Sequence, residues 1–235
     1  MKHIESRFIL LFICIYISCL SFGQTNLIRF YEKAKVGYKD DKGNVIVPPD
    51  YVAGSEFSEG YAIVLRDGKR GFINSKGEVV IPFRYDDASL FQNGVAFVME
   101  KGKYGYINTK GEYVIQPTFD YAEQFREGLA MVKKDGKVGF ITEKGEFAIA
   151  PQYEKAMGFV NGASTVRMNG KWGYIDKTGK VILPCKYDMA SAFTAEGTAV
   201  VIMGREHYKI NRRGKIIEEI KDREEEEREE RERRK

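Results

Sequence analysis

The residues of this chain best suited to chemistry are acidic side chains that recur at a fixed spacing. They follow an aromatic residue at 34-residue intervals, as Asp86, Asp120, Glu154 and Asp188, and Val52 breaks the series. Two such carboxylates could act as a general acid and base, or they could bind Ca²⁺. A side chain that is repeated in every copy of a unit more often serves the unit, because Asp and Glu accept backbone N–H bonds in turns. We therefore expect a turn-forming role for these carboxylates.

Few other residues could carry catalysis or bind a metal. The chain has two histidines, His3 and His207, and of its three cysteines only Cys185 lies outside the first 23 residues. No recognisable nucleophile accompanies His207, and one histidine with one cysteine does not make a typical zinc site. The glycine-rich stretches lack the GxxxxGK[ST] pattern of a phosphate loop. The sequence therefore predicts a protein that is not an enzyme, with no catalytic residue and no metal or cofactor site.

The first 23 residues have the pattern of a secretory signal peptide. Two basic residues precede an apolar run over 8–17, which is too short to cross a bilayer comfortably, and small residues lead up to Gly23. Cleavage after Gly23 would leave Gln24 as the first mature residue and no transmembrane segment. A lipoprotein anchored at Cys19 is an alternative, because the residues before Cys19 loosely resemble a lipobox, and a retained N-terminal anchor is another. The predicted location is the periplasm, the outer-membrane surface or the exterior.

A repeat of 34 residues organises the rest of the chain. Its register is carried by two glycine columns and two aromatic columns, each with five members. The glycine columns are Gly37, Gly71, Gly105, Gly139 and Gly173, each followed by Tyr or Phe, and Gly43, Gly77, Gly111, Gly145 and Gly179. The aromatic columns are Tyr51, Tyr85, Phe119, Tyr153 and Tyr187, and Phe57, Phe91, Phe125, Phe159 and Phe193. A sixth copy from His207 to Gly214 is degenerate, as is typical of a terminal cap.

The pattern within each copy predicts strands, although 34 residues is also the length of a helical repeat. Short runs rich in β-branched and aromatic residues alternate with turn signals such as Asp67-Gly68 and Asn169-Gly170. We expect a three-stranded antiparallel meander in each copy, followed by an irregular return segment. Alternation in the first strand places Ala62 and Val64, with their equivalents, on a packed face. The aromatic columns are expected in the core, and Gly71 and its equivalents allow close backbone approach.

These residues carry a resemblance to a known family. The stretch 170–182, which reads GKWGYIDKTGKVI, resembles the WG repeat of bacteria, also called KWG, and 102–108 and 136–142 are similar copies. The resemblance covers 29–220 and implies a β-rich repeat with no assigned catalytic activity. Only Trp172 keeps the tryptophan of the name, which argues against a ladder of sugar-stacking tryptophans. The other copies have Val36, Arg70, Tyr104 and Val138 at that position. The end of the signal-like segment also resembles exported proteins of Bacteroidetes.

The sequence thus divides into three regions. Residues 1–23 are the predicted signal peptide, 24–220 an all-β domain of five WG-type meanders and one degenerate copy, and 221–235 a charged tail, predicted to be helical or disordered. We expect the meanders to form an elongated superhelical array, with a propeller-like ring as the alternative. Propeller blades have four strands, whereas three are expected in each copy here.

The predicted function is that of a non-catalytic binding or scaffold module in the cell envelope or outside the cell. Its partner would be an unidentified protein or glycan, and not nucleic acid, since a net charge of +4 provides no large basic patch. An envelope enzyme such as a glycosidase and a purely structural spacer are alternatives. The predicted binding surface consists of positions that vary between copies, namely Tyr61, Phe97, Met131 and Thr165.

Overall fold

The computed structural model of the chain describes residues 27–221. The predicted signal peptide, the alternative anchor at Cys19 and the charged tail beyond Lys221 lie outside the described residues. The described part contains 23 β-strands and no helix. The all-β prediction is confirmed.

Six antiparallel sheets follow one another along the chain, each with its strands in sequence order. The first sheet contains β1 (Ile28–Glu32), β2 (Lys35–Lys39) and β3 (Val45–Tyr51). The second contains β4 (Ala53–Gly54), β5 (Tyr61–Arg66), β6 (Lys69–Asn74) and β7 (Val79–Tyr85), and the third contains β8 (Asp87–Ala88), β9 (Val95–Glu100), β10 (Lys103–Asn108) and β11 (Tyr113–Phe119). The fourth contains β12 (Tyr121–Ala122), β13 (Leu129–Lys134), β14 (Lys137–Thr142) and β15 (Phe147–Tyr153), and the fifth contains β16 (Lys155–Ala156), β17 (Ala163–Met168), β18 (Lys171–Asp176) and β19 (Val181–Tyr187). The sixth contains β20 (Met189–Ala190), β21 (Thr198–Met203), β22 (Glu206–Asn211) and β23 (Ile216–Ile220).

The three-stranded meander is present in every sheet, but the return segment is not wholly irregular. It begins with a two-residue strand that pairs with the next sheet: β4 starts just after β3 ends, yet it is hydrogen-bonded to β5. Each four-stranded sheet therefore combines residues from two consecutive sequence copies. The degenerate sixth copy also completes a four-stranded sheet, and its last strand β23 is exposed along its length.

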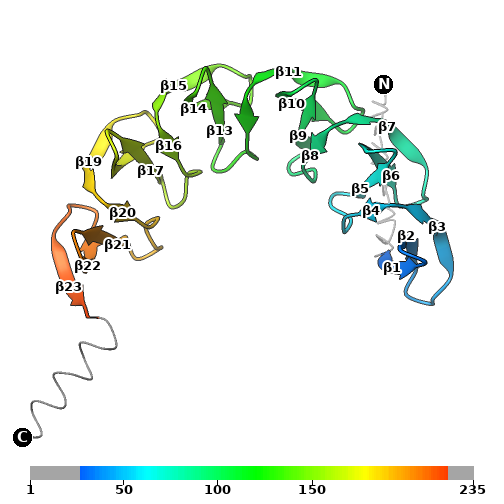
Figure 1. The fold of residues 1–235 in the computed structure, drawn as a ribbon, viewed down its shortest axis with the longest axis horizontal. Coiled ribbons are helices and arrows are strands. Elements are labelled where there is room, and N and C mark those ends of the chain that lie inside the picture. Colours follow the sequence, from blue (N-terminus) through cyan, green and yellow to red (C-terminus); the bar gives the residue numbers. More distant parts are fainter. Residues whose placement is uncertain (1–26, 222–235) are drawn as a thin grey trace, which may run out of the picture.

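The sheets succeed one another along an open arc (Figure 1). The two-residue strands β4, β8, β16 and β20 lie on the inner side of this arc, and β3, β7, β11, β15, β19 and β23 lie on its outer side. The first and last sheets are far apart, so the described residues form an open, elongated array and not a closed ring.

The constant spacing of the first glycine column follows from a bulge in each of the first five sheets. In the fourth sheet Val138 pairs with Tyr153 and Phe140 pairs with Ile149, so the register shifts across Gly139. A Cβ atom on Gly139 would lie 2.6 Å from the backbone oxygen of Ile149 and 2.7 Å from the backbone nitrogen of Pro151. Only glycine fits against this bulge, as the sequence predicts.

The core runs between the sheets. The Ala/Val face of the first long strand is buried in every four-stranded sheet, at Ala62, Val64, Ala96, Val98, Ala130, Val132, Ser164, Val166, Ala199 and Val201. The aromatic residue after each glycine packs on a phenylalanine 19 positions later, with ring centroids 4.4–5.1 Å apart. These pairs join one sheet to the loop of the next, so contacts between neighbours hold the array together.

Candidate binding surface on the inner side of the arc

The recurring carboxylates connect neighbouring sheets. Asp188, just after β19, forms an ion pair with Lys171 of the fifth sheet and accepts a 2.8 Å hydrogen bond from the backbone N–H of Gly204 in the sixth. Asp120 does the same with Lys103, at 2.5 Å, and Gly136. The expected acceptance of backbone N–H bonds is found, but the donors lie in a hairpin of the next sheet and not in the return segment itself.

These contacts also decide the charge of the carboxylates. A hydrogen bond from a lysine is the main cause that lowers the pKa of Asp86, Asp120 and Asp188 below the ordinary value. Each is therefore ionised at neutral pH and is a poor proton donor. Among residues 27–221 no group of three or more His, Cys, Asp or Glu side chains is placed to hold a metal ion.

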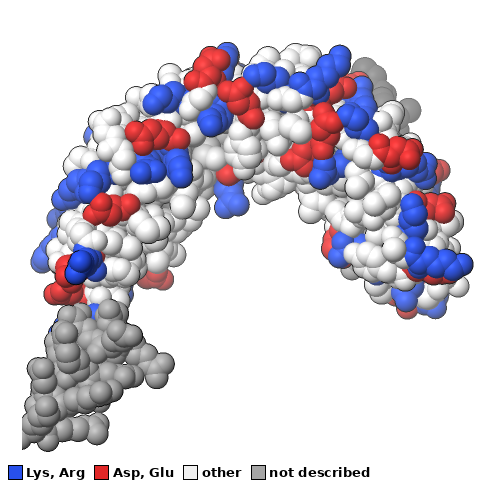
Figure 2. Space-filling view, in the orientation of Figure 1, with Lys and Arg blue, Asp and Glu red and all other residues white. Residues whose placement is uncertain are grey.

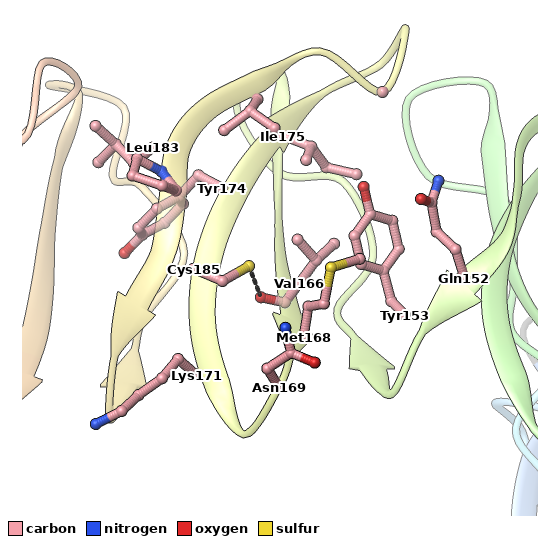
Figure 3. Close-up of a pocket in the computed structure, with 13 residues that line it drawn as sticks. Gln152, Tyr153, Val166, Met168, Asn169, Lys171, Tyr174, Ile175, Leu183 and Cys185 are labelled. Carbon is pink, nitrogen blue, oxygen red and sulfur yellow. Dashed lines mark hydrogen bonds between the residues drawn. The ribbon is translucent and has the colours of Figure 1, made fainter.

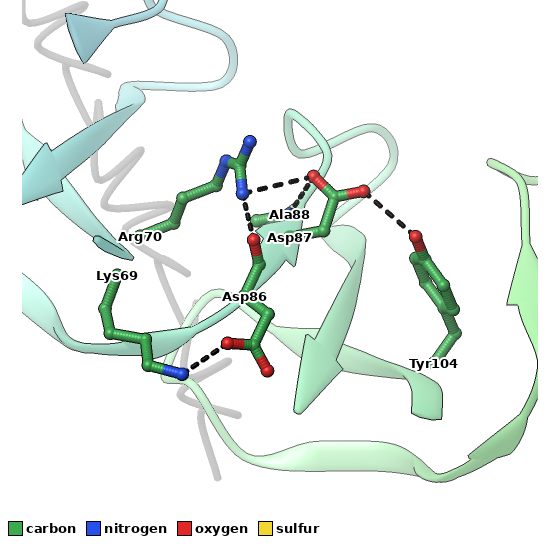
Figure 4. Close-up of polar contacts among 6 residues, drawn as sticks. All are labelled: Lys69, Arg70, Asp86, Asp87, Ala88 and Tyr104. Atoms are coloured by element: carbon green, nitrogen blue, oxygen red, sulfur yellow. Dashed lines mark hydrogen bonds and ion pairs between the residues drawn. The ribbon is translucent and has the colours of Figure 1, made fainter. Parts of the chain in front are cut away.

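Polar and aromatic side chains from the second, third and fourth sheets meet near the two-residue strands on the inner side of the arc. Figure 4 shows those of the second and third sheets. Arg70 of β6 lies 3.5 Å from the carboxylate of Asp87 in β8, and the Tyr104 hydroxyl donates a 3.2 Å hydrogen bond to the other oxygen of Asp87. Tyr104 also contacts two rings edge-on, that of Phe97 at 5.8 Å and that of Tyr121 at 5.7 Å between centroids. We name Phe97, Tyr104 and Tyr121 the inner aromatic cluster.

A cavity of about 390 Å³ opens beside this cluster, between the third and fourth sheets. Its walls combine apolar and polar groups, namely Ser89, Leu90, Phe97, Tyr121, Glu123, Gln124 and Arg126. The Gln124 side-chain amide donates a 2.8 Å hydrogen bond to the Leu90 carbonyl, which ties the two walls together. Tyr121, one of the lining residues, is 42% exposed. A volume of this size falls in the range of ligand-binding pockets.

The tyrosine hydroxyls here are suited to binding and not to proton transfer. Burial is the first cause that raises the pKa of Tyr104 and Tyr121 above the ordinary value, and the carboxylates of Asp87 and Glu123, respectively, raise it further. Both phenols therefore keep their protons at neutral pH. They offer hydrogen bonds and ring faces to a partner.

The structure separates the four residues of the predicted binding surface. Phe97 lines the inner cavity, whereas Met131 and Thr165, its equivalents in the next two sheets, are 8% and 2% exposed. Tyr61 is half-buried with its ring 5.2 Å from that of Phe91, and the true equivalent of Phe97 in the second sheet is Ile63. The four side chains do not form one surface.

Sequence reasoning missed Tyr104 and Tyr121, which the structure adds to Phe97. Tyr104 occupies the position of the family tryptophan, and Tyr121 lies 17 residues later, on the two-residue strand β12. Arg70 and Asp87 hold the same two positions one sheet earlier. The sequence signal for both residues is variation between copies: the position of Tyr104 and the position of Tyr121 each change residue type from copy to copy. These two positions lie half a period apart and meet between neighbouring sheets.

The surface charges are mixed. Figure 2 shows basic and acidic side chains side by side along the visible face, with no large area of one sign. The part of the chain that the structure describes holds no helix long and apolar enough to cross a membrane.

Comparison with known proteins identifies the repeat. The model of the WG containing repeat matches residues 37–69, 71–104, 104–137, 139–172 and 172–205. The chain belongs to the WG-repeat family. No curated protein matches it in sequence.

One solved structure shares the fold of this WG-repeat chain at low sequence identity, and others superpose less closely. A eukaryotic initiation factor superposes with a TM-score of 0.53 and 13% identity, over 83% of this chain and 63% of that protein. The chain thus spans less than two thirds of that protein's length. Hsv2p of Kluyveromyces lactis gives a TM-score of 0.48 at 12% identity, over 80% and 77% of the two chains. PorZ, a surface component of the type-IX secretion system of Porphyromonas gingivalis, gives 0.40 at 11%, over 85% and 31%.

Proposed function

We propose that this WG-repeat chain is a non-catalytic binding module that holds a partner protein on the inner side of its arc. The observation that carries the proposal is the cavity of about 390 Å³ beside the inner aromatic cluster. Exposed tyrosine and arginine side chains are the types that contribute most to protein interfaces, and both Tyr121 and Arg126 stand at this cavity. The open arc leaves this side accessible.

Binding is favoured over catalysis by the state of the polar groups. Lysines lower the pKa of Asp86, Asp120 and Asp188 and keep them ionised. Burial raises the pKa of the Tyr104 and Tyr121 phenols and keeps them protonated. A glycosidase needs one protonated and one ionised carboxyl group at a fixed separation. Glu123 is the one acidic residue among those that line the inner cavity, so the cavity lacks the second carboxyl group that a glycosidase needs.

A location in the cell envelope or outside the cell is part of the proposal. It rests on the signal-like pattern of residues 1–23, with cleavage after Gly23 or lipid attachment at Cys19 as the two routes. N-terminal sequencing and mass spectrometry of the protein isolated from its host would separate these routes. An uncleaved N-terminus on protein found only in the cytoplasm would contradict the proposed location.

The test compares capture of partners by matched variants of the chain beginning at Gln24. Wild type, Tyr121→Ala and Val114→Ala serve as baits for an envelope extract, and bound proteins are quantified by mass spectrometry. Val114 is an exposed residue on β11, on the outer side of the arc. Removal of a central tyrosine typically weakens an interface by about 2 kcal/mol, so we expect roughly 30-fold lower affinity with Tyr121→Ala and no change with Val114→Ala.

Two outcomes would contradict the proposal. Equal recovery by all three baits would place the interface away from the inner cluster. Recovery of no specific protein by wild type would favour a spacer, or a glycan ligand if binding to purified envelope polysaccharide is then found and is lost with Tyr121→Ala.

A further inference from the structure

A second cavity, of about 470 Å³, lies between the fourth and fifth sheets and has no part in the inner surface. Tyr153 of β15 forms one wall, and Val166, Met168, Val181 and Cys185 of the fifth sheet form the other. Figure 3 shows the end of the Met168 side chain beside the Tyr153 ring, and Met168 packs against the cluster that contains Tyr153. The Cys185 thiol is directed at the Val166 carbonyl, 3.6 Å away. The volume is within the range of small-molecule sites.

At the preceding junctions between sheets an aromatic ring of the chain itself packs in the corresponding place. Phe83 lies 6.0 Å from Tyr51 between ring centroids, and Phe147 lies 6.1 Å from Phe119. Tyr113 packs against the cluster that contains Tyr85. Tyr153 is the next member of the column that contains Tyr51, Tyr85 and Phe119.

A charged side chain accompanies each of these rings. The Arg66 guanidinium lies 4.9 Å from the Tyr51 ring centroid and 5.0 Å from that of Phe83. The Lys134 ammonium lies 5.9 Å from the Phe147 centroid. The Tyr113 hydroxyl donates a 2.6 Å hydrogen bond to Glu100.

The junction beside Tyr153 lacks both the ring and the charge. Val181 stands in the column of Tyr113 and Phe147, and Cys185 stands in the column of Phe83. Met168 replaces the charged residues of its column, Arg66, Glu100 and Lys134. Val181, Cys185 and Met168 thus leave open a space that a ring fills at each of the three preceding junctions.

We propose that this cavity binds a small neutral aromatic compound, whose ring contacts Tyr153 in the place that Phe83, Tyr113 and Phe147 take at the three preceding junctions. The Met168 thioether favours contact with a ring. Lys171 is the one charged residue that lines the cavity, and its ammonium is paired with Asp188, so the lining offers no unpaired charge and favours an uncharged ligand. Asn169 and Gln152 at the cavity provide amide groups for one hydrogen-bonding substituent. The site is independent of the proposed partner on the inner surface.

Indole is the probe for this site, and binding is measured by isothermal titration calorimetry with the chain beginning at Gln24. We expect saturable binding at one site, and affinity about 2- to 10-fold higher than that of cyclohexanol, from the added value of aromatic contacts. In parallel, indole should slow the alkylation of the half-buried Cys185 thiol by iodoacetamide, because Cys185 lines the cavity that indole would occupy.

Ring-transplant variants supply the control. Val181→Phe places in the cavity the residue found at position 147, and we expect at least a 10-fold loss of indole affinity. Val45→Phe makes the same change at the equivalent position of the first sheet, which does not line this cavity, and should leave affinity unchanged. Circular dichroism checks that both variants fold, and Cys185→Phe replaces Val181→Phe should that variant fail to fold.

The proposal would be overturned by any of three results. They are the absence of saturable binding together with unchanged Cys185 alkylation, undiminished indole affinity in a folded ring-transplant variant, and an equal loss of affinity with Val45→Phe.

Discussion

Substitution of Gly139 by alanine tests the packing that sets the repeat. Its added Cβ atom would lie 2.6 Å from the Ile149 carbonyl oxygen and 2.7 Å from the Pro151 nitrogen. Both atoms belong to the backbone of β15, so no side-chain rotation can relieve the clash. The bulge that joins β14 to β15 would have to open.

The expected loss is large for a single methyl group. Overpacking of a core costs about 1–3 kcal/mol, and a clash with rigid backbone lies at the upper end, so we expect about 3 kcal/mol. Gly128→Ala is the matched control, because Gly128 has a φ of +86° and no other group lies within 4 Å of the position that an added Cβ would take. That variant suffers only backbone strain, of about 1 kcal/mol.

Urea unfolding of both variants measures this difference. Fluorescence of Trp172, the only tryptophan of the chain, reports on the adjoining fifth sheet, and far-ultraviolet circular dichroism reports on all sheets. Free energies of unfolding for Gly139→Ala should lie about 2 kcal/mol below those for Gly128→Ala. Equal losses in the two variants would refute the close-approach explanation of the glycine column.

Three further predictions concern polar groups. Thr165→Val should raise the free energy of unfolding by about 1 kcal/mol in thermal or urea denaturation, because the Thr165 hydroxyl is buried without a hydrogen-bond partner. Tyr106→Phe should lower it by about 1 kcal/mol, because the Tyr106 hydroxyl donates a 2.7 Å hydrogen bond to the Glu123 carbonyl. Stability should fall as the pH drops below the ordinary aspartate pKa, because the pKa of Asp120 and Asp188 is lower in the folded chain than in the unfolded one. Asparagine at both positions should flatten this pH dependence relative to Asp50→Asn, a change at an exposed residue of β3.

The sequence predicts the repeated features of this fold well, because every copy meets the same neighbours. The alternation at Ala62 and Val64 identifies the buried face, and the glycine column identifies the bulge. The two-residue strands were missed, since two residues cannot display a period. Their pairing is also set by the next sheet and not by their own copy.

The candidate sites depend on differences between copies, which a single sequence does not explain. The alternation of residue types along a strand does not show whether a side chain faces a packed or an open junction between sheets. It therefore groups Met131 and Thr165 with Phe97, although both are buried in the structure. Tyr104 and Tyr121 lie half a period apart and meet only because neighbouring sheets stack. The cavity beside Tyr153 arises from the absence of a ring, which becomes visible only once the junctions are compared in space.

Small-angle X-ray scattering of the chain beginning at Gln24 tests the central claim most directly, namely that the sheets form an open arc with an accessible inner side. We expect an asymmetric distance distribution with a long tail, as an elongated array gives. A symmetric distribution with the small maximum dimension of a closed ring or globule would contradict it.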